Sequence, residues 1–150
     1  MLARAVQQLK YHGCRVLAGP LAELLAAHYR FPEDALLVPV PLHVSRLRAR
    51  GYNQAVLLAR GLARRRGLAC GPRVLVRIRA TAEHAGLGAE ARRANVRDAF
   101  RLRPGVRLRH RVVVVVDDVL TTGATADACA RVLHAAGARH VHVYTVGRTP

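Results

Sequence analysis

Two adjacent carboxylates follow the most apolar run of the chain, in the stretch VVVVVDDVLTTGAT at residues 112–125. Carboxylates accept hydrogen bonds, so Asp117 and Asp118 could bind the vicinal hydroxyls of a ribose or hold a divalent cation through water. The residues that follow are small or hydroxylated and lead into an expected helix, whose N-terminal N–H groups and dipole attract phosphate. These loop residues are Thr121, Thr122, Gly123, Ala124 and Thr125. Acid pair, spacer and phosphate loop together fit a ribose 5-phosphate.

A purely structural interpretation of the acids is also open, because aspartate before a helix is a common cap. The full order of features, with an apolar run, two acids, a spacer and a hydroxyl-rich loop, favours a ligand site instead. Familiar nucleotide motifs do not explain it. There is no GxxxxGK[ST], and the GxGxxA at Gly86, Gly88 and Ala91 follows no expected strand, so we interpret it as chance.

The elements around this stretch predict an α/β fold. A central strand at 111–116, a helix at 125–136 capped by Gly137 and a last strand at 140–146 form one βαβ unit. Ligands bind at the carboxyl ends of the strands in open α/β sheets, which is where the acids fall.

The earlier part of the chain supplies the remaining elements. We expect the following: helices at 2–9 and within 14–31, the second interrupted around Gly19–Pro20; a short buried strand at 35–40; a basic loop at 43–53; an amphipathic helix at 54–66 closed by Gly67; a half-buried strand at 73–79; and a long excursion at 80–100 with a helical piece near 89–96. Long irregular segments in compact domains are usually functional or disordered.

The composition is that of one domain of 150 residues with a core of Val, Leu and Ala, because aromatic residues make up only 4%. A core of these residue types is typical of helices packed on a mostly parallel sheet. The net charge of +16 attracts phosphates, nucleic acid or an acidic membrane face. The positive charge has a second explanation, because a GC-rich genome encodes proteins rich in arginine and alanine whatever function each protein has. Lys10 is the only lysine.

The three cysteines are isolated from one another and form no CxxC pair. We therefore expect reduced thiols, with no disulfide framework and no zinc site. No apolar run approaches the ~20 residues that span a bilayer, and the N-terminus lacks a signal-peptide apolar region. The sequence thus predicts a cytoplasmic protein without membrane insertion.

Several stretches together resemble the ComF family of type I phosphoribosyltransferase-like proteins. They are LKYHG, VPVPLHVSRLRARGYNQAVLLARGLA, AEARRANVRDAF and VVVVVDDVLTTGAT. The resemblance implies a type I phosphoribosyltransferase fold with a small N-terminal helical hood, in one domain over 1–150 with a helical part at 1–34 and a core at 35–150. ComF proteins are similar to the synthetase half of amidophosphoribosyltransferases and are implicated in natural competence.

Two departures from the family pattern affect what the resemblance implies. Family members commonly begin with a four-cysteine zinc ribbon, and this chain starts just after its place, so we expect no zinc. The family usually has Gln at the position of His84, which changes one loop contact.

The resemblance assigns residues to a site for phosphoribosyl pyrophosphate (PRPP) with Mg²⁺. Asp117 and Asp118 would bind the ribose and Mg²⁺, and the loop at 121–125 would hold the 5-phosphate. The pyrophosphate loop would include Val40, Pro41, Arg46, Arg50 and Asn53, and the mobile loop His84, Arg92 and Arg93. The prolines that break the strand at 35–40 also favour an anion site there.

Two of these assignments have structural alternatives, and a pair of histidines outside them was also considered. Asn53 could cap the following helix. Arg92 and Arg93 could belong to a solvated helix face. His140 and His142 could begin a metal site, but without a third ligand a surface or core role is favoured.

Three functions stay open at this point. The chain could be a phosphoribosyltransferase with an acceptor that the sequence does not identify. It could be a non-catalytic module that senses PRPP or docks onto competence or primosome proteins. It could bind single-stranded DNA through its arginines, although the scarcity of aromatic stacking platforms weighs against this.

Overall fold

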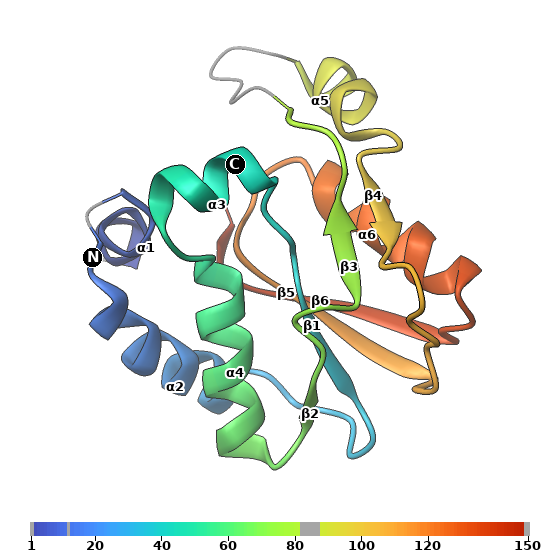
Figure 1. Ribbon diagram of the computed structural model, residues 1–150. Helices are drawn as coiled ribbons and strands as arrows, with labels where there is room; N and C mark the ends of the chain where they lie inside the picture. Colours follow the sequence, from blue (N-terminus) through green and yellow to red (C-terminus); the bar gives the residue numbers. More distant parts are fainter. Residues whose placement is uncertain (1, 12, 82–87, 149–150) are drawn as a thin grey trace.

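The computed structural model describes residues 2–11, 13–81 and 88–148. Its centre is a four-stranded sheet in the order β2-β1-β5-β6, in which every neighbouring pair is parallel (Figure 1). The strands are β1 (Leu36–Pro39), β2 (Ala69–Cys70), β5 (Val112–Leu120) and β6 (His140–Arg148). β5 therefore lies between two neighbours, as expected for the most apolar strand of a parallel sheet.

Helices cover both faces of this sheet (Figure 1). They are α1 (Leu2–Tyr11), α2 (Ala18–His28), α3 (Val44–Arg50), α4 (Gln54–Arg66), α5 (Ala89–Val96) and α6 (Ala124–Ala135), with a 3-10 turn η1 (Arg15–Leu17). α1, α2 and α4 pack on one face. The other face packs against α6, a residue of α5 and an antiparallel pair formed by β3 (Leu75–Arg77) and β4 (Phe100–Leu102). The described helices include none long and apolar enough to cross a membrane.

The five valines before the acids divide between the two layers. Val114 and Val116 are fully buried against α2 and α4, whereas Val113 and Val115 are fully buried against α6. Successive side chains of a strand point to opposite faces, so a central strand needs apolar residues at every position. This requirement explains the unbroken run.

Most of the expected elements are confirmed, including the helix at 54–66 with Gly67 in a left-handed conformation and the βαβ unit at the C-terminal end. The expected basic loop at 43–53 is wrong, because α3 occupies most of it. His43 Nδ1 accepts a hydrogen bond from Ser45 N, and Gly51 ends the helix at a φ of +81°. Val44 and Leu47 are exposed, so the helix has no buried apolar face that periodicity could reveal.

Other expectations differ from the structure at their ends or in their pairing. β5 continues through both acids to Leu120, because β6 is long enough to pair with it. The expected strand at 73–79 is shorter and pairs with β4 outside the main sheet. Pro20 does not interrupt α2 but lies in its first turn, where a missing N–H costs nothing. The two short strands β2 and β4 were not predicted.

Candidate functional site

A cavity of about 570 Å³ opens at the carboxyl ends of β1 and β5. α1, α3, the first residue of α4, β3, the end of α5 and the loop before α6 complete its wall. Among the residues proposed from sequence, those that line it are Val40, Arg46, Arg50, Asp117, Asp118, Thr121, Thr122, Ala124 and Thr125. The structure thus brings two separate segments of the chain, 40–50 and 117–125, to the edge that parallel α/β sheets use for ligands.

The two acids differ in their partners. Asp118 is buried at 3% exposure, and its Oδ2 lies 3.4 Å from both Lys10 Nζ of α1 and Gln54 Nε2 of α4. Its Oδ1 accepts a hydrogen bond from Val119 N at 2.9 Å. Asp117 is half-buried and its Oδ1 accepts from Asp118 N at 2.8 Å. Asp118 is therefore well satisfied within the protein, and Asp117 less so.

The environment of Asp117 disfavours its charge. Burial, and then the neighbouring charge of Asp118, raise the pKa of the Asp117 carboxyl well above its usual range. Lys10 acts in the opposite direction but does not offset these effects. A cation bound at the acid pair would relieve this cost, so the pair is suited to a ligand that brings positive charge or hydroxyl donors.

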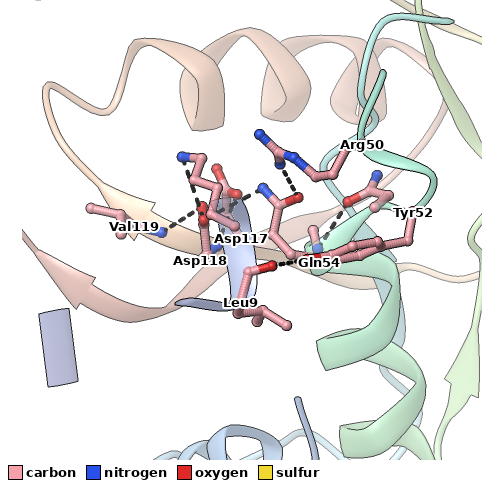
Figure 2. A network of polar contacts seen from close by, with 10 residues as sticks. Leu9, Arg50, Tyr52, Gln54, Asp117, Asp118 and Val119 are labelled. Atoms are coloured by element: carbon pink, nitrogen blue, oxygen red, sulfur yellow. Dashed lines mark hydrogen bonds and ion pairs between the residues drawn. The ribbon is translucent and has the colours of Figure 1, made fainter. Parts of the chain in front are cut away.

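A chain of polar contacts fixes the acids from the side of α3 and α4 (Figure 2). Arg50 Nη1 donates to Gln54 Oε1 at 2.5 Å, and Gln54 Nε2 in turn donates to Asp118. The Tyr52 hydroxyl donates to the carbonyl of Leu9, which ties α1 to the turn between α3 and α4. Lys10 follows directly on Leu9, so this contact also sets the position of the lysine beside Asp118.

The loop after the acids has the form of a phosphate cradle. Gly123 has a φ of +78°, a conformation that glycine adopts without strain, and it precedes the first turn of α6. Thr122 Oγ1 accepts from Ala124 N at 3.4 Å. The N-terminus of α6 therefore lies at the cavity wall, where its dipole and N–H groups favour an anion. Gly123 itself shapes the turn and is not among the residues lining the large cavity.

Asn53 supports the segment after β1 instead of lining the cavity. Its Oδ1 caps α4 by accepting from Ala55 N at 2.9 Å and Val56 N at 3.4 Å, and its Nδ2 donates to Val40 O at 2.9 Å. Val40 N also donates to Val116 O at 2.9 Å. One side chain thus serves both roles considered from sequence, cap and loop support. Pro41, like Asn53, is not among the lining residues.

The residues assigned to the mobile loop are only partly described by the structure. His84 lies outside the described residues. Arg92 falls within α5, and Arg93 is an exposed residue of the same helix. For Arg93 the solvated-face interpretation fits its exposure.

The lining also includes polar residues that were given no role from sequence, among them Lys10, Gln54, Arg77 and Thr81. The one feature of Lys10 that the sequence shows is that it is the only lysine among 25 basic residues. Gln54 and Thr81 are buried at 3% and 6% exposure. Buried polar groups are normally hydrogen-bonded, but sequence cannot show burial at these positions.

Neither cysteine nor histidine forms a site of its own in the described part of the chain. Burial raises the pKa of the Cys70 and Cys129 thiols, so both stay protonated at neutral pH. His140 and His142 are exposed on β6, which fits the surface role. Across residues 2–11, 13–81 and 88–148, no group of three or more His, Cys, Asp or Glu could hold a metal ion.

Comparison with known proteins found no matching family model. DNA utilization protein YhgH of Salmonella typhi is 37% identical over 155 residues, which cover 99% of this chain and 67% of that protein. Competence protein F of Haemophilus influenzae is 35% identical over 113 residues, covering 75% of this chain and 49% of that protein.

Two solved structures share the fold. Glutamine phosphoribosylpyrophosphate amidotransferase from B. subtilis, complexed with ADP and GMP, has a TM-score of 0.57 at 23% identity, covering 86% of this chain and 26% of that one. An allosteric regulatory enzyme of purine biosynthesis has a TM-score of 0.55 at 22% identity, covering 86% and 25% of the two chains. The fold is therefore the type I phosphoribosyltransferase fold, as expected.

Proposed function

The chain belongs to the family of DNA utilization protein YhgH and competence protein F, and on this premise we propose that its cavity binds PRPP together with Mg²⁺. One observation carries the proposal. A single cavity presents an acid pair, a hydroxyl-rich loop at a helix N-terminus and three arginines, which are three kinds of group that PRPP needs. The PRPP amidotransferase of B. subtilis has the same fold, which adds support.

Each part of PRPP has matching groups in the wall. The N–H groups and hydroxyls of Thr121–Thr125 hold the 5-phosphate. Asp117 and Asp118 accept hydrogen bonds from the ribose hydroxyls. Arg46 and Arg50 face the diphosphate, because a guanidinium binds phosphate oxygens through two parallel hydrogen bonds.

The donor set fits Mg²⁺ in the form in which proteins bind it beside phosphates. This ion keeps several waters and takes one or two carboxylates plus substrate oxygens, in place of an all-protein cage. Asp117 and Asp118 supply two carboxylates, and the described residues offer no third. The ion would neutralise charge on the diphosphate as it leaves.

We extend the proposal to transfer of the phosphoribosyl group to an acceptor. The acceptor's lone pair forms the new bond to C1 of the ribose, while the bond from C1 to the diphosphate oxygen breaks and the diphosphate leaves with that electron pair. The reacting carbon becomes electron-poor, so the protein acts by positioning and by neutralising charge. No protein nucleophile is required.

Calorimetric titration of PRPP with Mg²⁺ tests the binding site, with ribose 5-phosphate and pyrophosphate as control ligands. We expect saturable PRPP binding that is lost in the double variant Asp117→Asn, Asp118→Asn while the protein stays folded. A well-folded wild-type chain that takes up no PRPP would overturn the proposal.

The relatives' names connect the family to the use of DNA, and we propose that this chain acts in DNA uptake during natural competence. A catalyst and a PRPP sensor would both bind PRPP, so binding cannot separate them. Pyrophosphate release does: with PRPP, Mg²⁺ and a panel of bases, amines and ammonia, a transferase releases pyrophosphate only in the presence of its acceptor. If none of the tested acceptors causes release of pyrophosphate, the sensor is favoured.

A further inference from the structure

Outside the cavity, the segment that joins β4 to β5 carries an arginine at every second position (Figure 1). Arg107, Arg109 and Arg111 are exposed, whereas the residues between them are partly buried. Val106 and Leu108 pack against the core on the α6 side of the sheet. An alternation with period two is that of an extended chain. The apolar residues thus hold this segment on the protein, and the arginines face solvent.

One further exposed arginine lies next to each end of this segment. At its start, a turn over residues 103–106 with Gly105 at a φ of +81° brings Arg103 close to the segment. At its end, the carbonyl of Arg111 accepts a hydrogen bond from Arg139 N at 2.7 Å, so Arg139 is its direct neighbour. Both added arginines are exposed. We call these five residues the arginine strip: Arg103, Arg107, Arg109, Arg111 and Arg139.

The charges of the arginine strip are not compensated within the described residues. The sequence has no acidic residue between Asp98 and Asp117. None of the five guanidinium groups forms a hydrogen bond or ion pair with another described residue. Asp34 lies two residues before Leu36, which pairs with Val113, yet it forms no ion pair with the strip. Like charges that are held side by side without a counter-charge favour the binding of a polyanion.

The spacing of the strip matches the backbone of a nucleic acid. Two residues of an extended chain span about 6.6 Å, which is comparable to the separation of successive phosphates along an extended single strand. A guanidinium binds phosphate oxygens through two parallel hydrogen bonds. The strip bends at the turn over 103–106, and a flexible single strand can follow this bend, whereas the phosphates of a duplex keep a fixed helical course. Residues 101–111 include no aromatic side chain, so the contacts are to phosphates and not to bases.

We propose that the arginine strip binds the phosphate backbone of single-stranded nucleic acid without sequence preference. This inference goes beyond the proposed PRPP site, because none of the strip residues lines the cavity. Arg111 precedes the amino-terminal end of β5, and Asp117 follows six residues later, roughly 20 Å along the strand. The strip and the cavity therefore lie at opposite ends of β5, and both can be occupied at once. The strip provides a surface for the connection with DNA that the relatives' names express.

Fluorescence anisotropy with a labelled poly-dT oligonucleotide tests the strip. We expect the triple variant Arg107→Gln, Arg109→Gln, Arg111→Gln to bind about a hundredfold more weakly at about 0.1 M salt. The reason is that each lost phosphate contact removes about 0.7 from the slope of log K against log salt, which is about fivefold in affinity at this salt. The three side chains are exposed and without partners among the described residues, so the variant should fold.

The matched control removes the same charge from exposed arginines of three other places in the chain. It is the triple variant Arg4→Gln, Arg30→Gln, Arg48→Gln, and we expect it to lose less than about fivefold in affinity. Both triple variants reduce the net charge equally, so the difference between them measures the arrangement of the strip. At constant ionic strength, saturating PRPP with Mg²⁺ should leave the affinity for poly-dT unchanged.

Several outcomes would overturn the proposal. Equal losses in the two triple variants would show that net charge alone matters. Displacement of the oligonucleotide by poly-glutamate at the same concentration of charge would show that the strip does not select phosphates. A duplex of equal length that binds as tightly would rule out the single strand as its ligand. Should the strip variant fail to fold, Arg109→Gln alone should lose about fivefold, and no loss would refute the strip. Because poly-dT binding is first measured without PRPP, a failure of the PRPP site would leave this result unaffected.

Discussion

At the scale of single residues, the acid pair shows how neighbours in one strand acquire different roles. Asp118 is stabilised by Lys10, by Gln54 and by the backbone, so its charge is largely compensated before any ligand binds. Asp117 has a raised pKa because it is buried beside Asp118. The charged form of Asp117 is therefore unfavourable in the free protein, and a bound ligand would remove this unfavourable free energy. Such conflicts between stability and local chemistry are typical of functional sites.

The first prediction is that Asp117→Asn makes the protein more stable at neutral pH while weakening PRPP binding at least tenfold. The amide removes a buried carboxylate but keeps an acceptor for Asp118 N. We expect Tm at pH 8 to rise by about 2–4 °C, the shift that roughly 1 kcal/mol produces in a chain of this size. Thermal unfolding followed by circular dichroism and calorimetric titration check the two parts.

The pH dependence of this difference gives the sign of the effect. A carboxyl whose pKa is higher in the folded state than in the unfolded state stabilises the fold at low pH, and that stability is lost as pH rises through the folded pKa. The advantage of Asp117→Asn should therefore disappear towards pH 4. Asp118→Asn is the control and should lower Tm, since it removes the partner of Lys10. If Asp117→Asn were less stable than wild type at pH 8, the conclusion that the charge of Asp117 destabilises the fold would be contradicted.

At the scale of elements, the position of α4 decides the geometry of the site, because its first residue is Gln54 and its cap is Asn53. α2 packs directly against it, and Gly61 of α4 faces Ala22 of α2 in this contact. A Cβ added there would lie 2.8 Å from Ala22 Cβ, closer than real side chains permit. The absence of a side chain at Gly61 thus lets the two helices approach one another.

The second prediction concerns this contact. Gly61→Val should lower the free energy of unfolding by about 1–3 kcal/mol, the usual cost of overpacking a core. Chemical denaturation measures it. Ala27→Val on the exposed side of α2 is the control, with an expected cost below about 1 kcal/mol from helix propensity alone. Equal losses in the two variants would show that close packing at Gly61 is unimportant. PRPP affinity of the folded Gly61→Val protein should be unchanged, since Gly61 lies outside the cavity lining.

Elements with a strong local pattern were the ones that the sequence could predict. The valine run of β5, the amphipathic α4 and its cap at Gly67 all carry their signal in adjacent residues. α3 could not be found this way, because its apolar residues Val44 and Leu47 are exposed. Nor could the pairing of β3 with β4, since the two strands are short and separated by more than twenty residues.

The same distinction applies to the site. The residues at 117–125 are contiguous, so their order already indicates acids beside a phosphate loop. Lys10, Gln54 and Arg77 come from three other segments, and only the fold brings them to one cavity. Their side-chain types alone do not indicate that they line the same cavity, because a lysine or arginine is usually a solvated surface residue.

At the scale of the whole molecule, charge is distributed unevenly between the site and the remaining surface. The chain has 25 basic and nine acidic residues. The described residues that line the cavity include two acids and four basic residues, so most of the excess positive charge lies outside the cavity. Arg64, Arg65 and Arg66 form an exposed run at the end of α4. Such a surface attracts polyanions without a specific site.

Aromatic residues are arranged differently from those of a stacking platform for nucleic acid. The Tyr29 and Tyr144 rings stack on each other at 4.2 Å, and Phe31 packs edge-on against Tyr144 at 4.9 Å. The Tyr29 hydroxyl donates to Thr145 O, and the Tyr144 hydroxyl donates to Arg30 O. These three rings contribute to packing between the segment after α2 and β6, so they do not form a stacking platform for bases.

The last prediction follows from this balance. Any binding of single-stranded DNA by the chain should be weak in sequence preference and steeply dependent on salt, because each neutralised phosphate adds about −0.7 to the slope of log K against log salt. Fluorescence anisotropy with a labelled poly-dT oligonucleotide between 50 and 200 mM salt measures this slope. Replacing Arg64 and Arg65 by Gln should reduce its magnitude by about 1.4 if each arginine neutralises one phosphate, while PRPP affinity stays constant. Tight binding that is insensitive to salt would contradict a charge-driven interaction, since stacking or base contacts would then have to dominate.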